Sequence, residues 1–524
     1  RRSTTAWQAQ PSLQLLRGAH ALRFGAGLRR FRAHGYLDYF ARGSLNFSGA
    51  LTTSGVADLL LGLPTLGIQA QFDNRQDLRT HALNFYAQDD WRLAPRLTLT
   101  LGLRYEYNSP PTAPDGRMYA LNPVTMRLER TGANGVPRGG LRPDRNNFAP
   151  RLGLAWTPVP RTTFRAGYGF FHDANMLVVS SSLYFNPPLF NIRVFFPSED
   201  SLLTLNDPFP SGGGFAPPPS PTTISPDLRT ASLQHWNLAI ERELDAATSL
   251  SLGYVGSKGT HLNRSRDLNQ PAPGPGGVDE RRPSPDFGSI FFTESGGNSS
   301  YHSLQALVNR RLARRVSLLA SYTWAKSIDD ASAFLATNAD ANFPQNSRDY
   351  AAERARSSFD VSHRLSAAAV FEAPFGIVLR TITTAQTGAP FTPILRFDNS
   401  NTGNASGNNG YDRPDVSANP RLGARTPQRW FDTGAFSPAR PFTFGNAGRN
   451  IVEAPGLVNF DVSAARLFRL TETLRLTVEA QMFNLTNTAH FNLPERYADE
   501  PSTFGRILSA RSPRQLQFAL RLHF

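Results

Sequence analysis

The stretch HALNFYAQDDWRLAPRLTLTLGLRYEY, residues 81–107, contains two segments that alternate apolar and polar side chains. Such a period of two is typical of a strand with one apolar face and one polar face. Only the short LAPR segment separates the two halves, which predicts a tight β-hairpin. In the second half, the residues on the apolar face are Leu97, Leu99, Leu101, Leu103, Tyr105 and Tyr107.

Similar pairs of alternating segments recur along the chain, and each pair is joined by a few turn residues. A weaker pair lies within 11–30, and a single unpaired segment, RQLQFALRLHF (514–524), ends the chain. In this last segment Leu516, Phe518, Leu520, Leu522 and Phe524 share one face, which predicts a terminal strand. The other pairs are 151–156 with 162–171, 233–244 with 250–256, 303–312 with 316–324, 361–371 with 377–386, and 458–468 with 474–483.

The connections between the pairs are long and rich in Pro, Gly, Asn and Ser, whereas the turns within pairs are short. Compact domains seldom contain even one structureless loop of more than about 15 residues. A transmembrane β-barrel has this asymmetry, with short periplasmic turns and long outer loops. We therefore expect an all-β fold, an antiparallel barrel of the outer-membrane type. The expected extracellular loops are about 108–147, 172–231, 258–300, 327–358, 388–456 and 485–512.

Strand length and strand pairing agree with a barrel. Eleven residues at about 3.3 Å each, tilted by about 40°, rise roughly 28 Å, which is close to the apolar band of an outer membrane. In a closed barrel the terminal strand pairs with the first strand, so that no edge stays open. We therefore expect the free edge of 514–524 to be paired.

Composition excludes several other classes. Cysteine is absent from the 524 residues, which rules out disulfides and Cys-ligated metal sites. The net charge of +14 comes from basic residues that are spread along the chain, so we expect no nucleic-acid partner. Apart from Lys258 and Lys326 these basic residues are all arginines. No apolar run approaches the roughly 18 to 20 residues of a membrane helix.

Several strings resemble TonB-dependent outer-membrane receptors, in particular the Oar-like group. They are the hairpin FYAQDDWRLAPRLTLTLGLRYEY (85–107), ADLLLGLP (57–64), SYTWAKSIDD (321–330), FNLTNTAHFN (483–492) and the terminal FGRILSARSPRQLQFALRLHF (504–524). The similarity extends from about residue 20 to the end of the chain. The resemblance implies a Gram-negative transporter with a 22-strand barrel and an N-terminal plug, and contact with the TonB system through that plug.

The same resemblance implies a role for the last strand as a signal for the barrel-assembly machinery, carried by Phe518, Leu520, Leu522 and Phe524. No plug sequence is found, and the chain opens RRSTTAWQ without an initiator Met. We count fifteen strands, which would correspond to strands eight to twenty-two of the family barrel. The expectation is a C-terminal barrel portion, 1–524, embedded in outer-membrane lipid, with the plug and first strands upstream.

No motif predicts an enzyme or a bound cofactor. The histidines are too far apart for a zinc motif, and no Walker A or G-x-S-x-G string occurs. Two carboxylate pairs occur, Asp329–Asp330 and Asp89–Asp90, and the position of the latter beside Trp91 favours an interfacial polar role over acid–base chemistry. The segment DNSNTGNASGNN (398–409) resembles a calcium loop but has Asn409 where the bidentate Glu belongs, so no metal is expected.

Two long loops contain aromatic residues that need a partner outside the membrane. That partner could be another loop, the barrel mouth or an extracellular ligand of unknown identity. An adhesin or export-linked surface barrel, which transports no small molecule, is the alternative to a receptor. The candidate ligand-contact residues are Phe185, Phe190, Phe195 and Phe196 in the loop 172–231, and Trp430 and Phe431 in the loop 388–456.

Overall fold

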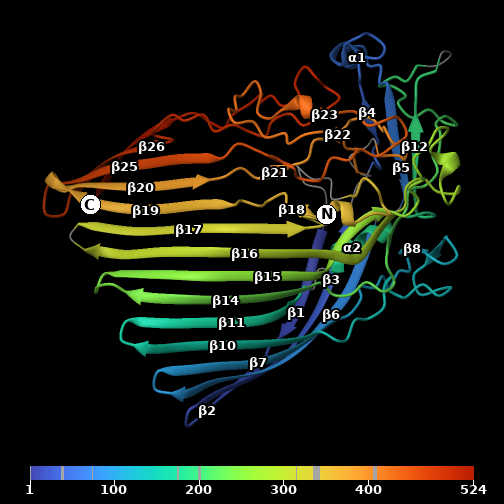
Figure 1. The fold of residues 1–524 in the computed structure, drawn as a ribbon. Helices are drawn as coiled ribbons and strands as arrows, with labels where there is room; N and C mark the ends of the chain where they lie inside the picture. Colours follow the sequence, from blue (N-terminus) through green and yellow to red (C-terminus); the bar gives the residue numbers. More distant parts are fainter. Residues whose placement is uncertain are drawn as a thin grey trace.

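The computed structural model describes residues 2–36, 40–72, 75–173, 176–198, 202–313, 315–333, 343–404 and 410–524. One sheet of eighteen strands dominates it, and nearly all of its neighbouring strands are antiparallel. Short turns join the strands at one end of the sheet, and the long connections gather at the other end (Figure 1). We call these the turn end and the loop end.

Fifteen long strands cross the sheet, as the sequence predicted. β1 (Arg2–Ala9) and β2 (Ser12–Arg17) are counted as one interrupted strand, because both pair with β3 (His20–Tyr36). The short strands β13 (Thr222–Ile224) and β18 (Ala355–Arg356) attach at the loop end. The others are, in spatial order, β6 (Arg75–Ala94), β7 (Leu97–Asn108), β10 (Phe148–Val159), β11 (Thr162–His172), β14 (Ser232–Glu243), β15 (Thr248–Asp267), β16 (Phe291–Ala313), β17 (Val316–Asp329), β19 (His363–Ala373), β20 (Ile377–Gln386), β25 (Leu457–Arg469), β26 (Arg475–Phe483) and β27 (Gln515–His523).

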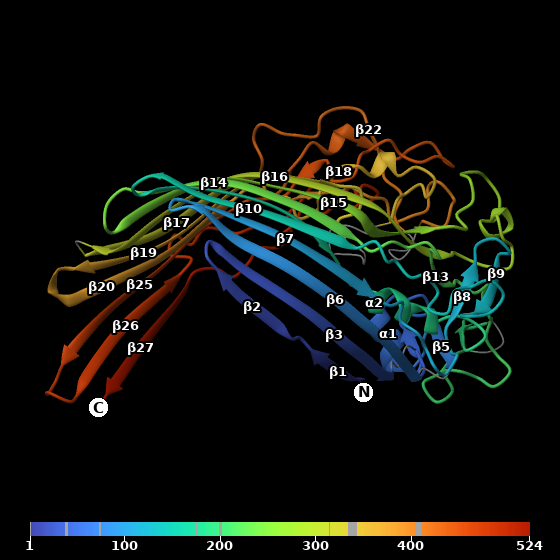
Figure 2. The same cartoon turned by 90° about the horizontal axis from the view of Figure 1, so that it is seen from below.

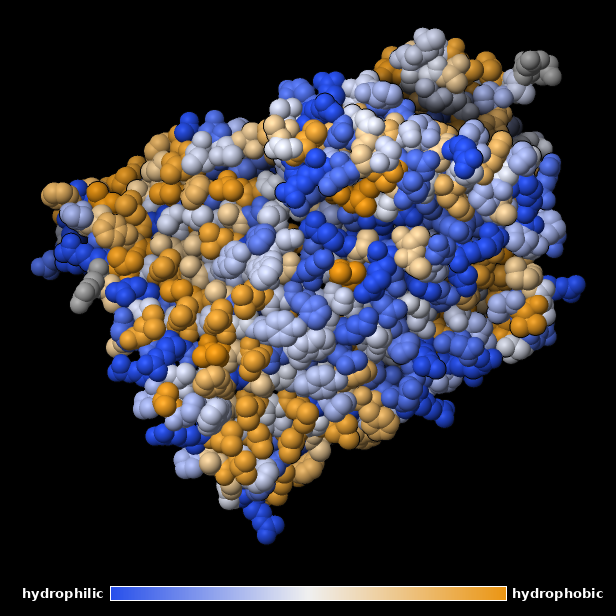
Figure 3. Space-filling view, viewed as in Figure 1, coloured by the Kyte–Doolittle hydropathy of each residue, from blue (hydrophilic) through white to orange (hydrophobic). Residues whose placement is uncertain are grey.

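The register places the alternating residues as predicted. In the hairpin of β6 and β7, Tyr105 lies opposite Phe85 and Leu103 lies opposite Ala87. These side chains share what we call the apolar face of the sheet. Figure 3, which looks onto the convex side of the sheet, shows hydrophobic residues over the part of the strands nearest the turn end. Hydrophilic residues gather over the loop end in the same view. The convex side thus carries an apolar band of the kind that faces lipid.

The sheet is an open arch rather than a closed barrel (Figure 2). β27 pairs with β26, and β1 and β2 pair with β3, but no described strand joins β27 to β1 or β2. The expected pairing of the terminal strand with the first strand is therefore not found. The physical reason is that fifteen strands with this curvature cover only part of a circle.

Two connections differ from the sequence prediction. Almost half of the predicted loop 258–300 is strand, because β15 continues to Asp267 and β16 begins at Phe291, so that both extend beyond the apolar band. A connection between β3 and β6 was not among the predicted loops. It contains α1 (Gly55–Leu61), β4 (Ser44–Asn46) and β5 (Leu66–Phe72).

The remaining helices and strands are short and lie in the connections, apart from one turn-end helix, η4 (Pro374–Gly376). The described parts contain α2 (Met176–Ser181), η1 (Ser182–Tyr184), η2 (Asp279–Arg281), η3 (Ala351–Glu353), η5 (Thr433–Ala435), β8 (Tyr119–Asn122), β9 (Arg127–Arg130), β12 (Phe190–Phe195), β21 (Pro390–Phe391), β22 (Asp415–Val416), β23 (Phe436–Ser437) and β24 (Val452–Glu453).

Candidate functional site

The connections at the loop end pack against one another and form what we call the loop cap. Its largest apolar cluster joins the β7–β10 and β11–β14 connections, with Met118, Leu183 and Ile224 fully or almost fully buried. A second cluster contains Phe391, Phe431, Val452 and Phe504. Because loops that bury apolar side chains in this way gain stability from one another, the cap is a built structure rather than a set of free loops.

Buried ion pairs tie the connections together. Arg413 and Glu353, whose side chains are each 5% exposed, form two hydrogen bonds of 2.7 and 3.1 Å between the β20–β25 and β17–β19 connections. Arg449 forms a second buried ion pair, in which its guanidinium donates to the Asp329 carboxylate and to the Asp329 backbone carbonyl at the end of β17. Such pairs contribute directional contacts that fix how one connection sits on the next.

The calcium-like segment binds its own backbone. One Asp398 oxygen accepts a hydrogen bond from the Thr402 amide, and the other accepts one from the Gly403 amide at 2.6 Å. Asp412 accepts hydrogen bonds from Ser400 and Asn404, and burial raises the pKa of the Asp412 carboxyl against the opposing effect of these bonds. Position 409 lies outside the described residues. The carboxylates therefore serve the fold of this turn, an arrangement typical of Asx turns.

The paired carboxylates are also engaged. Asp89 Oδ2 is hydrogen-bonded to His20 Nδ1 at 2.7 Å, and Asp90 Oδ2 lies 3.2 Å from Arg23 Nη2 on the neighbouring strand. Asp330 lies 3.8 Å from Arg264, beside the Asp329–Arg449 pair. Among the residues that the structure describes, no group of three or more potential ligands converges as a metal site. No helix in the described ranges is long and apolar enough to cross a membrane.

The aromatic candidates of the β11–β14 connection divide into two groups. Phe185 and Phe190 pack edge to face, with ring centroids 5.6 Å apart, and both line a groove of about 920 Å³. Phe195 is buried against Phe209, and Phe196 is 62% exposed outside the groove. The structure therefore brings only Phe185 and Phe190 of these four to one cavity.

Most of the groove wall was not singled out from the sequence. Ile192 and Arg193 come from β12, which reaches the cap by pairing with β5 of the unpredicted β3–β6 connection. Phe215, which pairs with Val194 of β12, and the proline run 217–219 also line the groove. The proline run was visible in the sequence, but a pairing between two separate connections leaves no periodic signal there.

In the β20–β25 connection, the candidate aromatics belong to the interior of the cap. Phe431 is 2% exposed and packs against Phe391 and Phe504. Trp430 donates a hydrogen bond from its indole nitrogen to the Glu453 carbonyl at 2.8 Å. These contacts match loop-on-loop packing, which the sequence had left open beside ligand contact.

The terminal strand presents its apolar face to the surroundings. Phe518, Leu520, Leu522 and Phe524 are all exposed, and Phe524 is 98% exposed. These side chains continue the apolar face of β26 next to them, where Leu520 lies opposite Val478. A row of exposed apolar side chains with an open hydrogen-bonding edge is stable only in lipid or against another strand.

A model of the outer membrane beta barrel domain family matches residues 1–517, so the chain belongs to this family. The fold is also found in solved structures at 10–12% identity. The Escherichia coli outer membrane transporter YddB matches 99% of this chain and 54% of its own, with a TM-score of 0.55. The match with a variant of the Pseudomonas aeruginosa ferric enterobactin receptor PfeA covers 99% of this chain and 54% of the receptor chain, with a TM-score of 0.51. No curated protein matches the sequence significantly.

The family confirms the predicted fold class and the outer-membrane location. The chain spans about half the length of these solved relatives. At this identity the likeness establishes a shared fold, that of outer-membrane receptors and transporters, and not a shared ligand.

Proposed function

We propose that the chain is the barrel portion of a TonB-dependent receptor that binds a ligand at the loop cap and takes it up across the outer membrane. The groove of about 920 Å³ is the observation that supports this most. Its volume is in the range of known small-molecule sites, about 300 to 1,000 Å³, and ligand sites are mostly apolar with a few polar groups. Phe185, Phe190 and Phe215 supply ring surfaces, and Arg193 and Asp286 supply charge.

Three parts of this proposal come from the sequence resemblance. They are a plug upstream of Arg1, contact with TonB through that plug, and insertion by the barrel-assembly machinery, which reads the terminal strand. The loop cap faces the extracellular side in this proposal, because outer loops are the long ones in outer-membrane barrels. Nothing in the site requires catalysis, so the proposal includes no reaction.

The test compares cells that carry the intact protein with cells that carry the Phe185→Ser/Phe215→Ser variant. Both side chains line the groove, and neither is fully buried, so the barrel should assemble normally. Metabolite profiling of the medium measures which small molecules the cells deplete. We expect the variant and a TonB-deficient strain to lose depletion of the same compound.

Phe196→Ser is the matched control, because Phe196 is an exposed aromatic of the same connection that does not line the groove. Normal depletion by the groove variant would remove the groove as the binding surface. Depletion that persists without TonB would contradict a TonB-dependent receptor. Loss of attachment to surfaces, with depletion unchanged, would favour the adhesin alternative.

A further inference from the structure

Both lysines of the chain lie on the apolar face at the same level of the sheet. On β16, His302 lies opposite Lys326 of β17, and the neighbouring Ser300 lies opposite Lys258 of β15. Lys258 and Lys326 therefore lie on the same face of β15 and β17, two residue positions apart along the strand β16 between them. Neither forms an ion pair or a side-chain hydrogen bond with any residue in the described ranges.

The lysines mark the loop-end boundary of the apolar band. From Lys326 toward the turn end, the same face of β17 carries Trp324, Tyr322, Ala320 and Leu318. Leu304 of β16 lies opposite Trp324, and Tyr254 of β15 lies opposite Leu304 on its other side. Aromatic residues at this position are typical of the level at which lipid headgroups begin. Lysines just beyond them lie at the level of the headgroups.

A groove of about 470 Å³ lies beside Lys326. Its lining includes Tyr254, His302, Leu304 and Trp324. The Tyr254 hydroxyl and His302 Nδ1 are 2.7 Å apart, which fixes the imidazole. The groove is therefore a preformed aromatic surface with a cation at its rim.

The arginine that lines this groove is already neutralised. Arg356 also lines the groove, but it bonds Asp360 at 2.7 Å and lies 3.5 Å from Glu453. Its charge is therefore balanced, and the free positive charge at this rim comes from the lysines. A free lysine ammonium attracts anionic headgroups at a membrane surface.

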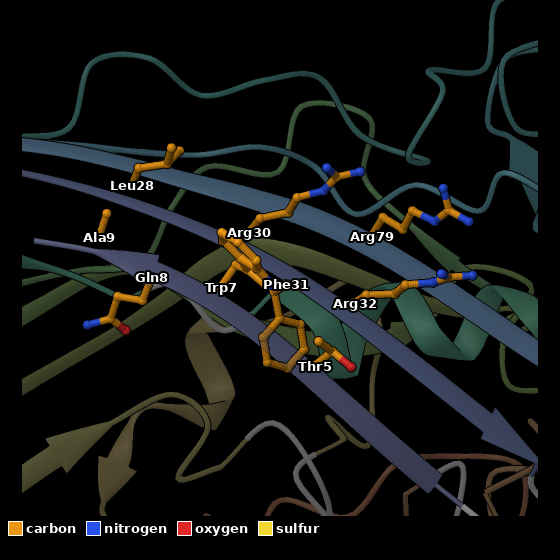
Figure 4. Close-up of a pocket in the computed structure, with 9 residues that line it drawn as sticks. All are labelled: Thr5, Trp7, Gln8, Ala9, Leu28, Arg30, Phe31, Arg32 and Arg79. Atoms are coloured by element: carbon orange, nitrogen blue, oxygen red, sulfur yellow. The ribbon is translucent and has the colours of Figure 1, made fainter.

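A similar combination recurs at the first strands. Trp7 lies opposite Arg30 on the apolar face, where β1 and β3 line a groove of about 510 Å³ (Figure 4). Arg32 and Arg79 nearby both bind Asp77, at 2.9 and 2.8 Å. Arg30 forms no ion pair with a described residue, and Trp7 is 78% exposed beside it. An unpaired cation next to a tryptophan at the loop-end rim is thus not confined to the lysine pair.

We propose that Lys258 and Lys326 bind the phosphate of an anionic lipid in the outer leaflet, while Tyr254, Leu304 and Trp324 contact the apolar part of the same lipid. The ligand must be a lipid, because the groove continues into the apolar band and a free anion would leave its aromatic wall uncovered. The assignment to the outer leaflet rests on the proposed orientation, with the loop cap outside.

The test uses the purified intact protein in detergent and bisphosphorylated lipid A as the probe, with bound lipid counted by native mass spectrometry. We expect Lys258→Gln/Lys326→Gln to weaken binding at least about tenfold. The Lys258→Arg/Lys326→Arg variant should bind nearly as well as wild type, because it keeps both charges. The matched control is Arg469→Gln, which removes an exposed charge at the turn end.

Equal binding by the double Gln variant, or an equal loss in Arg469→Gln, would overturn the proposal. Displacement of the lipid by millimolar inorganic phosphate would also overturn it, because the site would then be an anion site. Lipid binding by the purified protein does not depend on uptake. Failure of the receptor proposal would appear in the depletion assay, whereas failure of the lipid site would appear in the lipid-binding assay. The two failures can therefore be distinguished.

Discussion

The ion pair between Arg413 and Glu353 gives the most quantitative test of the loop cap. In the Glu353→Ala variant, a guanidinium that is 5% exposed keeps its charge but loses the carboxylate that accepts two of its hydrogen bonds. Breaking one partner of such a buried pair costs about 3–5 kcal/mol. Since about 1.4 kcal/mol is a factor of ten, local opening of the two connections should become roughly a hundredfold to a few thousandfold more frequent.

Hydrogen exchange of the detergent-solubilised protein measures this opening. Amides in 343–362 and 410–456 should exchange faster by that factor, whereas amides in β14–β16 should not change. Asp432→Ala is the matched control, because it removes an exposed pair with Arg429 in the same cap, which is worth about 1 kcal/mol or less. The Glu353→Leu/Arg413→Met variant removes both charges and should restore most of the protection. Unchanged exchange in Glu353→Ala, or equal acceleration in every strand, would refute this reasoning.

Two further predictions concern the strands. Deletion of Phe524, or Phe524→Asp, should lower the amount of assembled protein in the outer membrane far more than Phe196→Asp in the loop cap does, and equal levels would count against an assembly signal. Gly256→Val should lower the temperature at which the barrel loses its heat-resistant migration on gels, because a Cβ at this position would lie 2.4 Å from the Trp236 ring, an overpacking worth about 1–3 kcal/mol. Gly253→Ala, where the nearest atom is 3.5 Å away, should behave as wild type, and a similar loss in both would show that strand glycines matter here for another reason.

The strands were predictable because their signal is local. A period of two over nine or more residues, as in 97–107, needs no information from distant residues, and the register later follows from the short turns. The extension of β15 and β16 beyond the apolar band was not predictable, because there the two faces are both polar and the alternation disappears. The serines and glycines around 295–300 predict a loop in the sequence, but in the structure they belong to β16 and pair with β15.

The site was predictable only in part. Aromatic residues among prolines, such as Phe185 and Phe190, indicated that something must cover them. The difference between Phe190, which lines a groove, and Phe431, which is core, depends on contacts between connections far apart in the sequence. The two lysines were visible as a compositional oddity, but their alignment across three strands required the register.

The orientation of the chain in the membrane is the central claim, and site-directed cysteine labelling tests it most directly. Because the chain has no cysteine, one substitution gives one label position. Val124→Cys lies in the loop cap and is 89% exposed in the structure, and Glu472→Cys lies in the β25–β26 turn. In intact cells, a membrane-impermeant maleimide should label Val124→Cys, and it should label Glu472→Cys only after the outer membrane is permeabilised. Labelling of Glu472→Cys in intact cells, with Val124→Cys protected, would contradict the account.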